Sequence, residues 1–177
     1  MIDRLVMSGI AKSFGATRAL ECVDLAVGAG ASLALIGENG AGKSTLMKIL
    51  TGAIRPDGGT MVLDGKPFAP HGPLDARTHG VAIVHQELAI AAELTVAENV
   101  LLGALPTRGG FTDLKKQRAL AFAALDQLGC RELADLRRAG DLPIAQQQLV
   151  EIARAIAAGP RLLVLDEPTS SLTAEDV

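Results

Sequence analysis

Apolar and polar residues alternate in short blocks along this chain, and six apolar blocks have the length and composition of β-strands. These blocks are residues 5–10, 23–27, 33–36, 60–63, 81–84 and 162–165. The first, second and fourth are joined by glycine-containing turns, which predicts a small antiparallel sheet. The third and the last each lead into a polar loop, as parallel strands with crossover helices do.

Helical spacing of apolar residues predicts three helices between the last two strands. The first covers residues 95–102 and is followed by a loop at 106–110. Thr112 is the predicted N-cap of the second helix, which stops at Gly129, and the third follows Pro143 and stops at Gly159. The apolar faces of the last two helices contain Ala121, Ala124, Leu125, Leu128, Leu149, Ile152, Ala153 and Ile156. The pattern as a whole predicts an α/β core with a helical insert.

Composition narrows the class of protein. The 177 residues carry a net charge of −3, so the chain lacks the basic footprint of nucleic-acid binding. The longest apolar region, 88–105, is interrupted by Glu93 and Glu98 and does not predict a membrane span, and the N-terminus has no signal-peptide pattern. Cys22 and Cys130 lie far apart and are expected to be small buried residues in a reducing cytoplasm.

Residues 37–45 carry the clearest chemistry in the sequence. Gly37, Gly42, Lys43 and Ser44 fit the phosphate-binding loop G-x-x-x-x-G-K-[ST]. An apolar run precedes this loop, and a helical pattern with Leu46, Ile49 and Leu50 on one face follows it. Backbone N–H groups, the helix N-terminus and the lysine charge suit phosphate, while the Ser44 hydroxyl suits Mg²⁺. The chain is therefore predicted to bind a nucleoside triphosphate.

Two further strand ends carry polar residues that suit the same chemistry. The strand at 162–165 ends in Asp166 and Glu167, which are placed to hold Mg²⁺ and to accept a proton from an attacking water. The strand at 81–84 leads to Gln86, whose amide oxygen can reach a metal ion, whereas neighbouring His85 is expected to be structural.

With these three elements in this order, the chain resembles the ATP-binding domain of ABC transporters over essentially its whole length. Residues 12–15, which include Phe14, look like the adenine-stacking loop; residues 84–87 match the Q-loop, and residues 166–170 match the Walker B segment. Segments 37–48, 84–88, 94–99 and 146–154 are similar to the first of two tandem domains in bacterial importers of ribose, xylose, arabinose and galactose.

The resemblance implies a P-loop NTPase fold, α/β with a mixed sheet, and roles for particular residues. The core would comprise residues 1–86 and 160–177, with a small antiparallel β part, and the helical insert would comprise residues 87–159. The implied ATP-binding residues are Phe14 for the adenine and Gly37, Asn39, Gly40, Ala41, Gly42, Lys43, Ser44 and Thr45 for the phosphates. The implied Mg²⁺ ligands are Ser44, Gln86 and Asp166. Catalysis would rest on Glu167, assisted by Lys43 and Gln86.

The sequence departs from the family pattern at two places. Residues 142–146 read Leu-Pro-Ile-Ala-Gln where the family has Leu-Ser-Gly-Gly-Gln, and Pro143 removes both a hydroxyl and an amide donor from the signature loop. The family's switch histidine follows Walker B, but the three histidines here precede Asp166. The D-loop match, Ser170-Ser171-Leu172-Thr173, lies near Val177, so the sequence is expected to hold a domain truncated after that loop.

The resemblance implies an ATPase that powers monosaccharide import from the cytoplasmic face of the inner membrane, as a peripheral subunit. Implied partners are a second ATP-binding domain, membrane permease subunits and, indirectly, a periplasmic sugar-binding protein, with no nucleic acid. The apolar residues Leu94, Val96, Val100 and Leu101 either contact the permease or form ordinary core. Two other functions stay open: a non-catalytic nucleotide-binding or assembly module, and a non-transport ABC ATPase.

Overall fold

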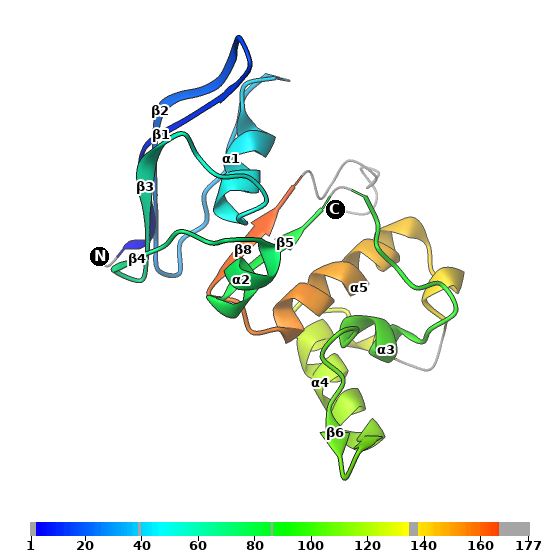
Figure 1. The fold of residues 1–177 in the computed structure, drawn as a ribbon. Helices are drawn as coiled ribbons and strands as arrows, with labels where there is room; N and C mark the ends of the chain where they lie inside the picture. Colours follow the sequence, from blue (N-terminus) through cyan, green and yellow to red (C-terminus); the bar gives the residue numbers. More distant parts are fainter. Residues whose placement is uncertain (1–2, 39, 86, 135–137, 167–177) are drawn as a thin grey trace. The chain divides into compact units, whose positions relative to one another are not determined.

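In a computed structural model the chain folds into two compact units, Met1–Val81 and Ala82–Val177. The structure describes residues 3–38, 40–85, 87–134 and 138–166 (Figure 1).

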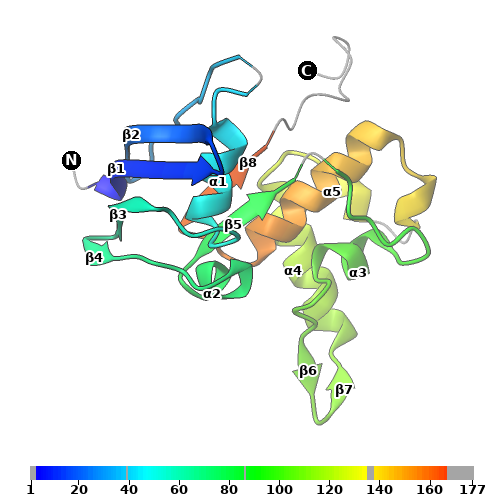
Figure 2. The same ribbon diagram turned by 45° about the horizontal axis from the view of Figure 1, so that its top comes forward.

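The first unit is built on a four-stranded antiparallel sheet in the order β2-β1-β3-β4 (Figure 2). The strands are β1 (Asp3–Phe14), β2 (Thr17–Gly28), β3 (Gly58–Leu63) and β4 (Lys66–Pro67). Leu5, Met7 and Ile10 of β1 are almost completely buried. The antiparallel sheet predicted from the first, second and fourth apolar blocks is confirmed, and its first two strands extend well beyond the predicted limits.

The two cysteines have different surroundings. Cys22 is exposed, with a φ of 55°, and lies where the β1–β2 register shifts between the pairs Ile10–Val23 and Lys12–Leu20. The prediction of a buried residue is wrong here because a bulge turns residues out of the regular alternation of a strand. Cys130 is buried as predicted, and desolvation raises the pKa of its thiol.

Two helices complete the first unit. Helix α1 (Lys43–Leu50) buries Leu46, Ile49 and Leu50 as the sequence predicted, and the short α2 (Pro73–Thr78) was not predicted. The predicted strand at 33–36 does not form, and Ile36 in this run is 95% exposed. An apolar block becomes a strand only when a neighbouring strand pairs with its backbone, and within the described residues none does.

Two short strands pair in the second unit: β5 (Val81–Val84), which begins at the last residue of the first unit, and β8 (Leu162–Leu165). The Asp166 N–H donates to the Val84 carbonyl oxygen at 3.0 Å. This hydrogen bond brings the carboxyl ends of the two strands together, as expected for a parallel pair, and places Asp166 beside the end of β5.

Three helices pack around one hydrophobic core in the second unit (Figure 2). They are α3 (Val96–Val100), α4 (Leu114–Asp126) and α5 (Ile144–Ala157), accompanied by two 3₁₀ turns, η1 (Arg131–Ala134) and η2 (Ala139–Asp141). A hairpin of β6 (Thr107–Arg108) and β7 (Phe111–Thr112) lies in the predicted loop. All three predicted helices are present.

Details at the helix ends correct the sequence prediction. Asp113, not Thr112, caps α4, because its side chain accepts the Lys116 N–H at 3.0 Å while Thr112 pairs with Thr107 in the hairpin. Val96 and Val100 of α3 and the following Leu101 belong to the hydrophobic core. Of the two alternatives predicted for these three side chains, core or contact with a permease, the structure therefore shows core. Among the described helices, none has the length and apolar character needed to cross a bilayer.

Candidate functional site: a phosphate loop at the start of helix α1

The loop before α1 folds around the ammonium group of Lys43. The Lys43 Nζ donates hydrogen bonds to the backbone carbonyl of Gly37 and, at 2.9 Å, to that of Glu38. The Ala41 N–H in turn donates to the Glu38 carbonyl at 3.1 Å. The lysine charge is therefore held inside the loop by the loop's own backbone, ready for an anion.

Position 42 of the loop has room only for glycine. Its φ is +85°, and a Cβ built on it would lie 2.4 Å from the Ala19 carbonyl oxygen and 2.7 Å from Leu20 Cδ2. Gly40 has nearly the same φ of +88°, but a Cβ there would meet nothing within 4 Å. Strand β2 thus supports the loop directly beneath Gly42 and leaves Gly40 open to solvent.

The N-terminus of α1 offers free donors to an anion. The first helical hydrogen bond is the one from the Leu46 N–H to the Gly42 carbonyl, at 2.9 Å. The N–H groups of residues 43–45 therefore have no acceptor within the helix. The first turn contains no acidic residue, and the Ser44 side chain is exposed beside it. Free N–H groups, the positive end of the helix dipole and Lys43 together fit a polyphosphate.

Phe14 forms an exposed platform at the tip of the β1–β2 hairpin. Its side chain is 50% exposed, and the Lys12 Nζ lies 5.7 Å from its ring centroid. Asp57 accepts from Lys12 Nζ at 2.6 Å and from the Ser13 N–H at 2.8 Å, and these hydrogen bonds lower the pKa of its carboxyl, that from Lys12 most. An exposed aromatic face of this kind suits stacking by a nucleobase.

The predicted metal-binding and catalytic residues beyond α1 are only partly described. Asp166 follows β8 and is half-buried, with its N–H bonded to β5. Asn39, Gln86 and Glu167 lie outside the described residues, so their assigned roles stay predictions. Lys43 and Ser44 belong to the first unit and Asp166 belongs to the second.

The divergent signature segment lies at the N-terminus of α5. Pro143 is the N-cap residue, with a φ of −54°, and the following Ile144 is 56% exposed. Gln147 ties the segment to its helix, donating through Nε2 to the Leu142 carbonyl at 2.8 Å and through its N–H to the Pro143 carbonyl at 3.0 Å. A helix N-terminus is thus presented as in a phosphate site, with one amide donor removed by the proline.

Sequence reasoning missed a buried polar network around Asn99. This side chain is fully buried; its Nδ2 donates to the carbonyls of Ala91, Leu94 and Thr95, and its Oδ1 accepts the Ala91 N–H. Arg154 of α5 donates to the Asn99 carbonyl at 2.7 Å, to its Oδ1 at 3.1 Å and to the Ala89 carbonyl at 2.8 Å. In the sequence, the only indication of this network was that Asn99 and Arg154 both lie in segments similar to sugar importers.

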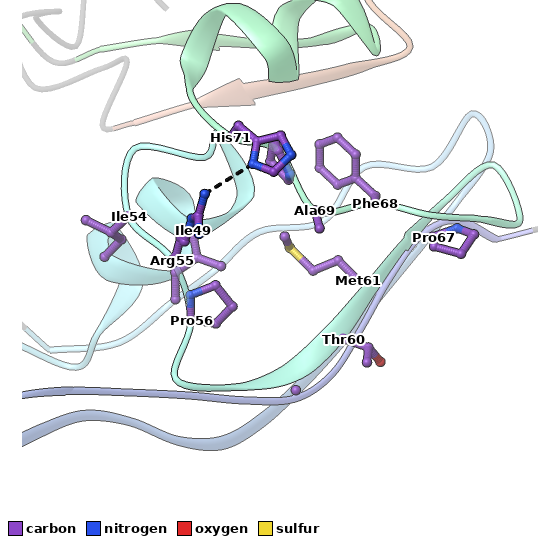
Figure 3. Close-up of a pocket in the computed structure, with 12 residues that line it drawn as sticks. Ile49, Ile54, Arg55, Pro56, Thr60, Met61, Pro67, Phe68, Ala69 and His71 are labelled. Carbon is purple, nitrogen blue, oxygen red and sulfur yellow. Dashed lines mark hydrogen bonds between the residues drawn. The ribbon is translucent and has the colours of Figure 1, made fainter.

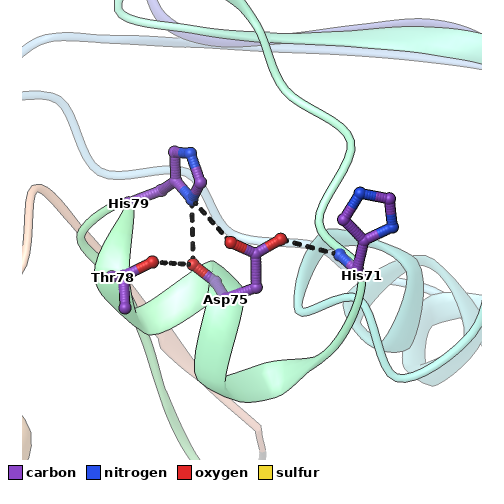
Figure 4. Close-up of polar contacts among 4 residues, drawn as sticks. All are labelled: His71, Asp75, Thr78 and His79. Atoms are coloured by element: carbon purple, nitrogen blue, oxygen red, sulfur yellow. Dashed lines mark hydrogen bonds and ion pairs between the residues drawn. The ribbon is translucent and has the colours of Figure 1, made fainter.

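The histidines of the first unit have structural contacts. Asp75 accepts the His71 N–H at 2.9 Å and lies 3.3 Å from His79 Nδ1, while Thr78 donates to the Asp75 carbonyl (Figure 4). The His71 hydrogen bond is the largest cause of the lowered pKa of Asp75. These contacts hold the first turn and the end of α2.

A hollow of about 370 Å³ lies elsewhere in the first unit (Figure 3). Its walls are mainly apolar and include Ile49, Met61 and Phe68. Arg55 and His71 also line it, and the Arg55 guanidinium donates to His71 Nδ1 at 3.2 Å. None of its lining residues belongs to the loop at 37–45, so this hollow is not the phosphate site.

Comparison with known proteins gives one consistent family. The family model described as ABC transporter matches residues 20–170. The chain is 45% identical over 171 residues to the ribose import ATP-binding protein RbsA 1 of Mesorhizobium japonicum, covering 97% of this chain and 33% of that protein. It is 48% identical over 174 residues to RbsA 2 of Streptomyces avermitilis, covering 98% of this chain and 34% of that protein.

Solved structures share the fold. One is an ATP-binding cassette of an ABC transporter in its ADP conformation, with a TM-score of 0.84 and 31% identity over 99% of this chain and 74% of that one. Another is cbiO1 from Clostridium perfringens, part of the ABC transporter complex cbiONQ, with a TM-score of 0.85 and 25% identity over 99% of this chain and 70% of that one. The chain spans about a third of the length of the curated relatives it matches.

Proposed function

This chain belongs to the ABC transporter family, and on that premise we propose that it binds Mg-ATP and hydrolyses it to drive monosaccharide import through a membrane permease. The observation that carries the proposal is the loop at 37–45, in which backbone carbonyls hold the Lys43 ammonium beside the free N-terminus of α1. Identities of 44% or more to ribose import ATP-binding proteins support a sugar as the cargo.

Different residues hold different parts of the nucleotide. Lys43 and the N–H groups at the start of α1 bind the phosphates, and Phe14 stacks against the adenine. The Ser44 hydroxyl, the Asp166 carboxylate and the Gln86 amide are oxygen donors of the type that Mg²⁺ prefers. When bound, the ion neutralises charge on the phosphate oxygens. Glu167 accepts a proton from the attacking water. Most of the rate gain comes from positioning and electrostatics, because phosphoryl transfer needs little covalent chemistry from the protein.

The partners follow from the same proposal. A second ATP-binding domain would close on this one, and the pair would act on permease subunits at the cytoplasmic face of the inner membrane. The sugar is chosen outside this chain, by the permease and a periplasmic binding protein. Residues 1–86 and 160–177 would form the core of the domain and residues 87–159 its helical insert. Pro143 would face the partner's ATP and weaken that site by about 1.5–3 kcal/mol for each missing donor.

The test compares Mg-ATP binding and turnover by the chain and three variants. Lys43→Ala should abolish binding, Glu167→Gln should keep binding and abolish turnover, and the control Lys48→Ala, in the last turn of the same helix, should change neither. Unchanged Mg-ATP affinity in Lys43→Ala would refute the assigned site. Binding without turnover in the parent chain would favour the second candidate, a nucleotide-binding module, to which Pro143 also points.

A further inference from the structure

The β6–β7 hairpin and the first turns of α4 form an exposed tip, which we call the hairpin tip and which comprises residues 107–118. The hairpin projects from the helices of its own unit in both views (Figures 1 and 2). Arg108 pairs with Phe111 across Gly109 and Gly110, whose φ values of 62° and 87° are those of a tight type I′ turn. The Asp113 N–H closes the base by donating to the Pro106 carbonyl at 2.8 Å.

The hairpin tip exposes two large apolar side chains. Phe111 is 81% exposed and Leu114 is 65% exposed. They are separated by only two residues, and Asp113 fixes the turn between them by capping α4. Phe111 is also the most exposed of the described phenylalanines. A protein in water gains nothing from exposing two large apolar side chains so close together in the sequence.

The same segment is basic, although the chain as a whole is acidic. Residues 107–118 contain Arg108, Lys115, Lys116 and Arg118 against the single acid Asp113, whereas the whole chain has a net charge of −3. Lys115, Lys116 and Arg118 are exposed. The two lysines lie in the first turn of α4, which contains no acidic residue. Cations at this position oppose the helix dipole, so their placement is unfavourable for the isolated helix.

Contact with a surface that is both anionic and apolar would bury the two exposed apolar side chains and pair the basic residues at the start of α4 with negative charge. We propose that the hairpin tip binds the surface of an anionic lipid bilayer. Phe111 and Leu114 enter the headgroup region while Lys115, Lys116 and Arg118 contact lipid phosphates, as in peripheral segments that combine apolar and basic residues. A projecting tip whose exposed apolar residues are followed directly by exposed basic residues suits a broad anionic surface better than the narrow groove of a protein partner.

The test is flotation of the chain with vesicles of phosphatidylcholine alone and with phosphatidylglycerol added. Binding should require phosphatidylglycerol, weaken at high salt and persist in Lys43→Ala, because it does not depend on ATP. Each basic residue near the surface contributes about fivefold to affinity, so Lys115→Glu with Lys116→Glu should weaken binding at least about 25-fold. Those glutamates suit the start of α4, so misfolding would not explain a loss.

Matched variants separate the contributions. Lys115→Arg with Lys116→Arg should bind as the parent chain does, and Phe111→Ser with Leu114→Ser should weaken binding on the order of tenfold. The controls Leu74→Ser and Lys66→Glu, an exposed apolar and an exposed basic residue of the first unit, should change affinity less than twofold. Failure to bind anionic vesicles, equal binding to both kinds, full binding by the double glutamate variant, or attachment only when a permease is present would each overturn the proposal.

Discussion

Gly40 and Gly42 provide a matched pair for testing how the phosphate loop is supported. Both have a φ near +85°, so replacing either with Ala imposes the same left-handed conformation, at about 1–2 kcal/mol. Only at Gly42 does the new methyl group also meet the Ala19 carbonyl oxygen at 2.4 Å and Leu20 Cδ2 at 2.7 Å. Overpacking of this kind typically adds about 1–3 kcal/mol. We therefore expect Gly42→Ala to cost about 2–5 kcal/mol and Gly40→Ala about 1–2 kcal/mol.

The assay is urea unfolding of both variants without nucleotide, followed by circular dichroism because the chain has no Trp or Tyr for intrinsic fluorescence. The free energy of unfolding should fall more for Gly42→Ala by at least about 1 kcal/mol, with unchanged denaturant slopes. Equal losses within about 0.5 kcal/mol would refute the inference that β2 lies directly beneath the loop. Omitting nucleotide keeps this test separate from the proposed ATPase activity.

Three further predictions concern the helices of the second unit. Asn99→Ala should lower the free energy of unfolding by about 2–4 kcal/mol in urea, because it leaves the Ala91 N–H without an acceptor and removes the side-chain hydrogen bonds to three carbonyls and to Arg154. Hydrogen bonds from Thr95, its N–H first, lower the pKa of Glu98 below its ordinary 4.5, so their stabilisation is present above that pH and lost as pH falls through the folded value. Stability measured against pH should therefore show the deficit of Glu98→Gln shrinking below about pH 4. Leu125→Ala should cost about 2–5 kcal/mol by thermal or urea unfolding, and the exposed control Leu120→Ala less than about 1 kcal/mol.

Local patterns in the sequence predicted most elements because their signals are complete within the element. Helix α4, for example, can be recognised from the spacing of its own apolar residues, and its end from Gly129, whose φ is positive. The run at 33–36 failed for the opposite reason: its apolar character matches a buried strand, but pairing depends on residues distant in the sequence. Helix α2 was missed because it buries only Ala76, so it has no apolar face to detect.

The phosphate loop could be predicted in the same local way. Glycine at 37 and 42, lysine at 43 and the helix that follows are close together in the sequence, and their chemistry points to one type of ligand. The sequence could not predict why Gly42 excludes a methyl group, because the obstacle comes from Ala19 and Leu20 in β2. It also could not reveal the exposure of Phe111 and Leu114, since an apolar residue in a turn segment can equally well pack against a neighbour.

Buried polar residues are the features least accessible to pattern analysis, and Asn99 is the clearest example in this chain. A polar residue inside an apolar helical face reads as an interruption of the core, whereas in the structure it holds backbone groups of the segment before α3. Arg154 of α5 also binds that segment, because its guanidinium donates to the Ala89 carbonyl. Burial lowers the pKa of this guanidinium. Because both side chains bind the same segment, residues 89–95 should move with α3 and α5 as one body. Any displacement of the chain just after residue 86 would then reach the helices directly.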